Sequence, residues 1–165
     1  MPSTLNIDLD SHDTRILAEL QADARLTMAE LGRRVHLSQP AVSERVRKLE
    51  SAGVISGYRA TVNLSKLGYG IRAIIRIGRA EYERVVKLVQ STPECVNAYN
   101  VTGEDSWILE IAVIDVSHLD AVVTKFCMLT ETATSIILNP ARENQAMLPP
   151  HRADVRPLIR KVTNA

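Results

Sequence analysis

Apolar side chains recur at helical spacing in three short segments of the first sixty residues. The three stripes are Ile16, Leu17 and Leu20, then Met28, Leu31 and Val35, and finally Val42, Val46 and Leu49. Each segment is preceded by a residue suited to a helix N-cap, namely Asp10, Thr27 and Ser38. Gly53 suits the end of the third segment. The pattern therefore predicts three helices, with a tight turn at His36-Leu37 between the second and the third.

The chain from residue 54 to residue 62 has an extended pattern, which predicts a short β wing and closes a domain over residues 1–62. Residues 63–70 contain two glycines and no clear periodicity, so we expect a linker there. Four prolines fall between residue 139 and the end of the chain. We predict that residues 141–165 form a tail that is ordered only against a partner chain.

Residues 71–140 switch between strand-like and helix-like patterns. Apolar positions alternate with polar ones from Ile71 to Ile77, and they follow helical spacing from Tyr82 to Val89. The same criteria predict strands over 96–102, 106–114 and 132–138, and a helix over 117–126. The order β-α-β-β-α-β is that of a ferredoxin-like domain. We therefore expect an α+β protein in which a winged helix-turn-helix, of three helices plus a short β wing, precedes a ferredoxin-like domain over residues 71–140.

Composition adds that the chain is an ordinary globular protein, with 165 residues of which 45% are apolar and 24% charged. No apolar run approaches the roughly 20 residues of a membrane span, and no secretory signal opens the chain, so we expect a cytoplasmic protein. The two cysteines and four histidines are scattered, which offers no metal site. Net charge is only +1, yet residues 33–48 carry five basic side chains against the single acid Glu44.

A basic helix pair with a tight turn suits DNA, because one helix can enter the major groove while the other braces it. Gln39, Ser43 and Arg47 share the face of the third predicted helix opposite its apolar stripe, and glutamine and arginine can pair with adenine and guanine. The simpler alternative is a charged face that is only solvated. The full set of residues predicted to bind DNA, through bases or phosphates, is Arg33, Arg34, Ser38, Gln39, Pro40, Ser43, Glu44, Arg45, Arg47 and Lys48.

A long motif in the first half resembles the leucine-responsive/asparagine-regulator (Lrp/AsnC, feast/famine) family. The matching residues are Leu9-Asp10-x-x-Asp13-x-x-Ile16-Leu17, Leu20-Gln21-x-Asp23-Ala24-Arg25, Glu30-Leu31, Leu37-Ser38, and Val42-x-x-Arg45-Val46-x-Lys48-Leu49-Glu50-x-x-Gly53-Val54-Ile55-x-Gly57-Tyr58. The resemblance extends to about Leu138. The family usually has glycine where this chain has His36, and histidine tolerates the left-handed backbone of such a turn.

The resemblance implies that the second domain is a ligand-sensing (RAM) domain with an amino-acid effector. Its hallmark turn corresponds here to Val101–Trp107, although the family's acid falls at Ser106 and the nearest acid of this chain is Asp105. Asp105 or Glu104 suits an ammonium group, and the backbone around Gly103 suits a carboxylate. The simpler alternatives are an ordinary hairpin turn and a packing role for Tyr99. The predicted effector residues are Tyr99, Thr102, Gly103, Glu104, Asp105, Thr132, Ala133, Thr134 and Ser135.

The sequence thus predicts a sequence-specific, DNA-binding transcriptional regulator whose DNA binding or assembly responds to a small molecule, an amino acid in particular. An alternative is a ligand-independent architectural DNA-binding protein of the same fold. An enzyme is disfavoured because the chain has no P-loop, dinucleotide fingerprint or metal spacing, and no cofactor is expected. One helix-turn-helix reads few base pairs, so we expect a homodimer on a roughly palindromic operator. The family resemblance implies further association of dimers, often into octamers.

Overall fold

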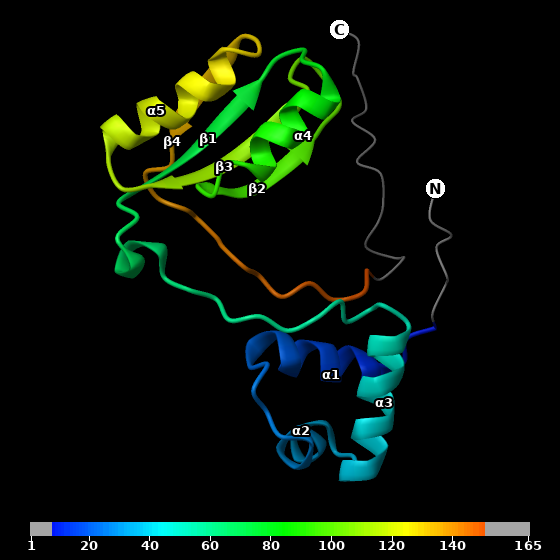
Figure 1. Ribbon diagram of the computed structural model, residues 1–165. Helices are drawn as coiled ribbons and strands as arrows, with labels where there is room; N and C mark the ends of the chain where they lie inside the picture. Colours follow the sequence, from blue (N-terminus) through cyan, green and yellow to red (C-terminus); the bar gives the residue numbers. More distant parts are fainter. Residues whose placement is uncertain (1–7, 151–165) are drawn as a thin grey trace, which may run out of the picture. The chain divides into compact units, whose positions relative to one another are not determined.

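The computed structural model describes residues 8–150, which fall into two compact units (Figure 1). The first unit comprises residues 8–60 together with 144–150, and the second comprises residues 61–143. The start of the predicted first domain, residues 1–7, and most of the predicted tail, residues 151–165, lie outside the described residues. The first unit therefore contains chain from both sides of the second unit in the sequence.

Three helices form the first unit, as the sequence predicts: α1 (Ser11–Ala22), α2 (Met28–Val35) and α3 (Gln39–Ser51). All three predicted N-caps are confirmed. Asp10 and Asp13 form a reciprocal capping box, Thr27 accepts a hydrogen bond from the Glu30 amide, and Ser38 accepts one from the Ala41 amide. The apolar stripes meet in a core of eight buried residues: Ile16, Leu17, Leu20, Leu31, Val35, Val42, Val46 and Leu49. Local capping and periodicity therefore account for this three-helix unit.

The predicted β wing does not form a strand in the single chain. Residues 54–63 form no strand, and the backbone at Gly57 has φ +151°. A strand needs a neighbour for its amides and carbonyls, and no strand of the first unit lies within the described residues to supply one. The predicted linker contains a single 3₁₀ turn, η1 (Leu64–Leu67), whose N-cap is the side chain of Asn63.

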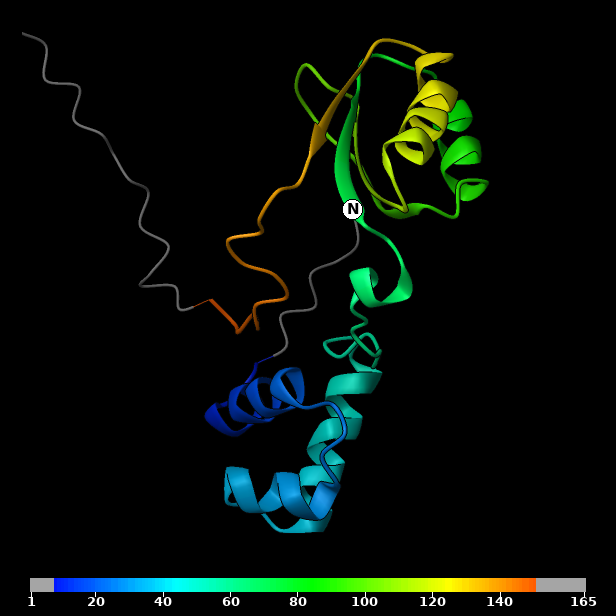
Figure 2. The same ribbon diagram turned by 90° about the vertical axis from the view of Figure 1, so that its left-hand side faces the viewer.

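The second unit is a four-stranded antiparallel sheet with two helices on one face. Its elements in chain order are β1 (Ile71–Ile77), α4 (Tyr82–Gln90), β2 (Cys95–Asn100), β3 (Trp107–Val113), α5 (Val116–Cys127) and β4 (Thr132–Ile136). The strand order is β2-β3-β1-β4, which confirms the predicted ferredoxin-like arrangement. Figure 2 shows α4 and α5 side by side against the same side of the sheet.

The core of the second unit lies between that face and the helices. Alternate residues of β1 and β3 are buried there with Val85 of α4 and Phe126 of α5. The opposite face of the sheet has no helix over it within the described chain, and it presents the other half of each strand. Helix α5 begins one residue before the predicted Ser117, because Asp115 caps it by accepting a hydrogen bond from the His118 amide. No helix in residues 8–150 is long and apolar enough to cross a membrane.

Candidate functional site

The turn between α2 and α3 has the geometry that a rigid helix-turn-helix requires. His36 adopts the left-handed backbone expected of this position, with φ 59° and ψ 43°. The Leu37 amide donates to the Gly32 carbonyl at 2.8 Å, which closes the turn. Gly32 is buried, and a Cβ built there would lie 2.7 Å from the Leu37 carbonyl oxygen. Sequence reasoning missed Gly32, because a glycine inside a helix is ordinarily a weak helix former and not a contact point.

The outer face of α3 carries the side chains predicted to contact bases. Val42, Val46 and Leu49 are buried against the other helices, while Gln39 and Arg47 are exposed and Ser43 is half-buried. The Ser43 hydroxyl donates to the Gln39 carbonyl at 2.8 Å, so it is held close to the helix backbone. Arg47 is 74% exposed and pairs with Glu44 one turn earlier. Gln39 and Arg47 are therefore the exposed members of this trio, and Arg47 is paired with Glu44.

Two of the predicted basic contacts are engaged inside the unit. Arg45 donates to Asp10 at 2.7 Å and to Asp13 at 2.8 Å, so it ties α3 to the capping box of α1. These two acceptors raise the pKa of Arg45, the Asp13 hydrogen bond contributing most. Arg34 likewise binds Glu19 of α1 at 2.9 Å, and also Glu30. Both arginines brace the helices against one another.

The remaining members of the DNA set lie at the surface. Arg33 is 77% exposed and pairs with Glu30, and Lys48 is exposed near the end of α3. Ser38 and Pro40 are exposed at the start of α3, where Ser38 caps the helix. The structure thus brings an exposed set together along α2, the turn and α3. Its members are Arg33, Ser38, Gln39, Pro40, Arg47 and Lys48.

The predicted effector turn joins β2 to β3 in the second unit. The Val101 amide donates to the Ser106 carbonyl at 3.0 Å, and the Ser106 amide donates to the Ile77 carbonyl at 2.8 Å. Gly103 has φ +127°, a backbone conformation that residues other than glycine rarely adopt. No atom lies within 4 Å of a Cβ built there, so backbone conformation and not crowding calls for glycine. Thr102, Gly103 and Glu104 are exposed.

Asp105 meets a cation that the sequence analysis did not single out. Its carboxylate lies 3.5 Å from the guanidinium of Arg76 on β1, and the two side chains are 31% and 52% exposed. Arg76 is opposite Ile108 in β3 and Ala133 in β4, and Ile108 is opposite Tyr99 in β2. These four residues therefore form one row across the open face of the sheet. The sequence signal for Arg76 was the alternation along β1, which places Arg76 on the face of the strand that is not buried.

The second half of the predicted effector set, Thr132–Ser135, forms most of the edge strand β4. Within one chain, β4 is separated from the β2–β3 turn by β1 and β3. Ala133, Thr134 and Ser135 are exposed, and the Thr132 hydroxyl lies 2.9 Å from the Cys127 sulfur. A single subunit therefore does not bring the turn and β4 into contact, and Arg76 stands between them on the open face.

A polar network occupies the middle of the open sheet face. Arg72 on β1 binds Glu110 on β3, and the side-chain amide of Asn97 on β2 donates to Glu110 at 2.8 Å. Burial raises the pKa of Glu110, but the hydrogen bonds from Arg72 and Asn97 outweigh burial and hold its pKa below the usual range. Within the described part of the chain, no cluster of three or more metal-ligating side chains occurs.

The comparisons with known proteins agree with this geometry. Residues 9–56 match a family model described as winged helix-turn-helix DNA-binding, and residues 72–147 match the Lrp/AsnC ligand binding domain. The transcriptional regulator LrpC of Bacillus subtilis is 35% identical, with 79% of this chain and 92% of LrpC covered. The solved structure of LrpC has a TM-score of 0.79 at 34% identity, covering 82% of this chain and 99% of that one.

Two further relatives are of the same kind. The leucine-responsive regulatory protein of Rhizobium meliloti is 36% identical over 80% of this chain and 88% of its own length. A structure of transcriptional regulator NMB0573 from Neisseria meningitidis in complex with L-Met has a TM-score of 0.79 at 27% identity, covering 85% of this chain and 96% of that one. The helix-turn-helix, the ferredoxin-like ligand-binding domain and these matches show that the chain belongs to the Lrp/AsnC family of DNA-binding, ligand-modulated transcriptional regulators.

Proposed function

We propose that this protein is a cytoplasmic, non-catalytic regulator that binds operator DNA as a homodimer and responds to an amino acid. The observation that carries the proposal is the Asp105–Arg76 pair beside the Gly103 turn. An α-amino acid carries one positive and one negative group on the same carbon, and this pair offers one partner for each. The L-Met complex of the Neisseria relative supports an amino acid as the effector.

Asp105 is the acceptor for the effector ammonium in this proposal. The carboxylate then lies toward Arg76 and the backbone amides of the turn, where a left-handed glycine lets an anion approach closely. The 3.5 Å separation of Asp105 and Arg76 is long for a charge-assisted hydrogen bond, so the pair can open at little cost. Thr132–Ser135 complete the site from another subunit, because β4 of the same chain is two strands away from the turn.

The DNA-binding half of the proposal rests on the outer face of α3. Gln39 and Arg47 read base edges in the major groove, and Arg33 and Lys48 contact phosphates. Arg34 and Arg45 act through the helix packing that they brace. Two copies related by two-fold symmetry read a roughly palindromic operator, and dimers associate further, as far as an octamer.

The homodimer uses the open face of the sheet in this proposal. Ile74 and Ile108 are half-buried there in a single chain, and Tyr99 is 55% exposed, so apolar surface remains to be covered. In this proposal, residues 1–62 bind DNA, residues 63–70 form a linker, residues 71–140 bind the effector and mediate assembly, and residues 141–165 form a tail.

The decisive experiment is calorimetric titration of the full-length protein with each common amino acid. We expect at least one to bind, and Asp105→Asn to weaken its binding at least tenfold while affinity for a single isolated operator stays within a factor of two. Gly103→Glu provides a second test, since any side chain strains the backbone at φ +127°. If no amino acid binds and DNA is still bound tightly, the ligand-independent architectural alternative holds instead.

A further inference from the structure

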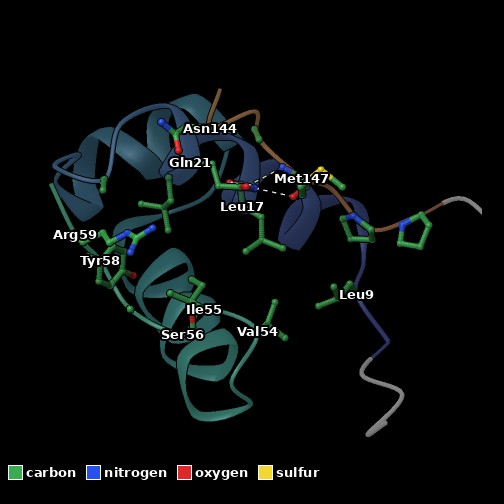
Figure 3. A pocket seen from close by; sticks show the side chains of 16 residues that line it. Leu9, Leu17, Gln21, Val54, Ile55, Ser56, Tyr58, Arg59, Asn144 and Met147 are labelled. Carbon is green, nitrogen blue, oxygen red and sulfur yellow. Dashed lines mark hydrogen bonds between the residues drawn. The ribbon is translucent and has the colours of Figure 1, made fainter. Parts of the chain in front are cut away.

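The first unit contains an apolar groove along α1 that the DNA-binding role does not use (Figure 3). With residues 144–150 in place as one wall, the space that remains has a volume of about 980 Å³. One side of the groove is formed by Leu17 and Leu20, which also belong to the three-helix core. Leu9 and residues 54–59 extend this side. The other side is chain from far along the sequence, residues 144–150. The groove is therefore already in contact with a segment that follows the whole second unit.

Gln21 holds this segment by its backbone. The Gln21 side-chain Nε2 donates to the Met147 carbonyl at 2.8 Å, and the Met147 amide donates to Gln21 Oε1 at 2.8 Å. Both bonds appear as dashed lines in Figure 3. Nε2 also donates to the Leu17 carbonyl at 3.1 Å, which fixes the orientation of the side-chain amide. The pairing reproduces one rung of a β-ladder, with a glutamine amide in place of a peptide group.

The Met147 side chain takes little part in this contact. Met147 is 75% exposed, while Pro149 is half-buried against the groove. Two consecutive prolines fix their own φ angles and restrict Leu148 and Pro149 to extended conformations. A segment that is already extended loses little conformational entropy on docking, as in other modes of recognition of proline-rich chains. The groove thus suits an extended, proline-containing backbone.

We propose that this groove is the docking site of the chain's own residues 144–150, and that their docking stabilises the DNA-binding unit. When the segment leaves, the cavity lined by Leu17 and Leu20 loses one of its walls and α1 loses the contact at Gln21. Helix α1 also begins with the capping box that holds Arg45 of α3. A change in the stability of α1 is therefore transmitted to the helix that faces DNA.

Hydrogen exchange of the full-length protein, read by mass spectrometry, tests the contact directly. We expect the Met147 amide, which donates to Gln21, to exchange about five- to tenfold more slowly than in a free peptide of residues 141–152, as expected of one net hydrogen bond. Gln21→Ala should abolish this protection, because it removes the side-chain oxygen that accepts from the Met147 amide. The matched control Met147→Ala keeps both backbone groups and should leave the protection unchanged. Equal exchange in wild type and Gln21→Ala would overturn the proposal.

A pair of truncations tests the effect on stability. Ending the chain after Pro150 keeps the docked segment, whereas ending it after Glu143 removes it. We expect only the shorter chain to show a lower urea midpoint for the helical signal, and identical midpoints for the two truncations would refute the stabilising role. Protection that disappears on tenfold dilution of the full-length protein would show that the segment comes from a second copy, which would overturn docking within one chain.

Discussion

Gly32 provides a sharp test of the helix-turn-helix geometry, through the substitution Gly32→Ala. The added methyl group would lie 2.7 Å from the Leu37 carbonyl oxygen, about 0.7 Å short of the 3.4 Å at which ordinary van der Waals contact begins. The obstacle is backbone and not a flexible side chain. The same two residues are also joined by the 2.8 Å hydrogen bond from the Leu37 amide to the Gly32 carbonyl. The turn therefore cannot move away without weakening its own closure.

The magnitude follows from two opposing terms. Overpacking a closely fitted site costs about 1–3 kcal/mol, and replacing a helical glycine by alanine returns up to about 1 kcal/mol of helix propensity. We expect the first unit to lose about 1–2 kcal/mol of its free energy of unfolding. Ala29→Gly, at an exposed position of the same helix, is the matched control, because it changes only the propensity term and does so with the opposite sign.

Urea unfolding of the full-length protein measures the effect with an internal reference. Circular dichroism at 222 nm follows the helices, most of which belong to the first unit, and fluorescence follows Trp107, the single tryptophan, in β3 of the second unit. With a slope of about 1 kcal/mol per M, the helical midpoint should fall by roughly 1–2 M while the fluorescence midpoint stays in place. A helical midpoint that is unchanged or raised would show that the turn yields freely, and the geometric argument would be refuted.

The remaining predictions concern charged groups. Arg47→Ala should weaken specific operator binding by about 1–3 kcal/mol and relax preference at one base pair in fluorescence anisotropy, with unfolding unchanged; a uniform loss across all sequences would mark Arg47 as a phosphate contact. Arg45→Ala should lower the helical urea midpoint, because it leaves Asp10 and Asp13 without their partner, and an unaltered midpoint would contradict the bracing role. The pKa of Glu110 is lower in the folded protein than its ordinary value. Ionised Glu110 therefore stabilises the fold at pH values above the ordinary carboxyl pKa, and this stabilisation is lost as pH falls through the folded-state pKa. Glu110→Gln should therefore flatten the fall of the Trp107 midpoint below about pH 4.5, and an unchanged acid profile would exclude this carboxylate as its source.

The features that the sequence predicts well are those decided by neighbours along the chain. The capping residues Asp10, Thr27 and Ser38 act on amides three positions away, and the left-handed turn at His36 depends on local backbone sterics. Hydrophobic alternation likewise predicts the strand from Ile71 to Ile77, and the β-α-β-β-α-β order of elements predicts the ferredoxin-like sheet. These signals are short in range and are fully present in the sequence.

The features that were missed depend on contacts between distant parts of the chain. Gly32 is required by the approach of a carbonyl from the turn, and Arg76 meets Asp105 only because β1 lies beside β3. Arg45 fits a phosphate contact on charge alone, but its partners are the same acids that cap α1. Residues 54–62 form no strand in the single chain because an extended sequence pattern does not by itself supply the neighbouring strand that pairing needs.

The division of the first unit into two stretches of sequence has a consequence for synthesis. A ribosome releases residues 8–60 first, then the whole of residues 61–143, and only afterwards the segment that contacts α1. The three helices already hold their shared core before that segment exists, so the nascent helix-turn-helix presents an apolar groove for as long as the second unit is being made. Apolar surface on a nascent chain attracts chaperones and neighbouring chains. Premature termination near residue 143 would fix the protein in this state, with all its DNA-facing residues present and the groove open.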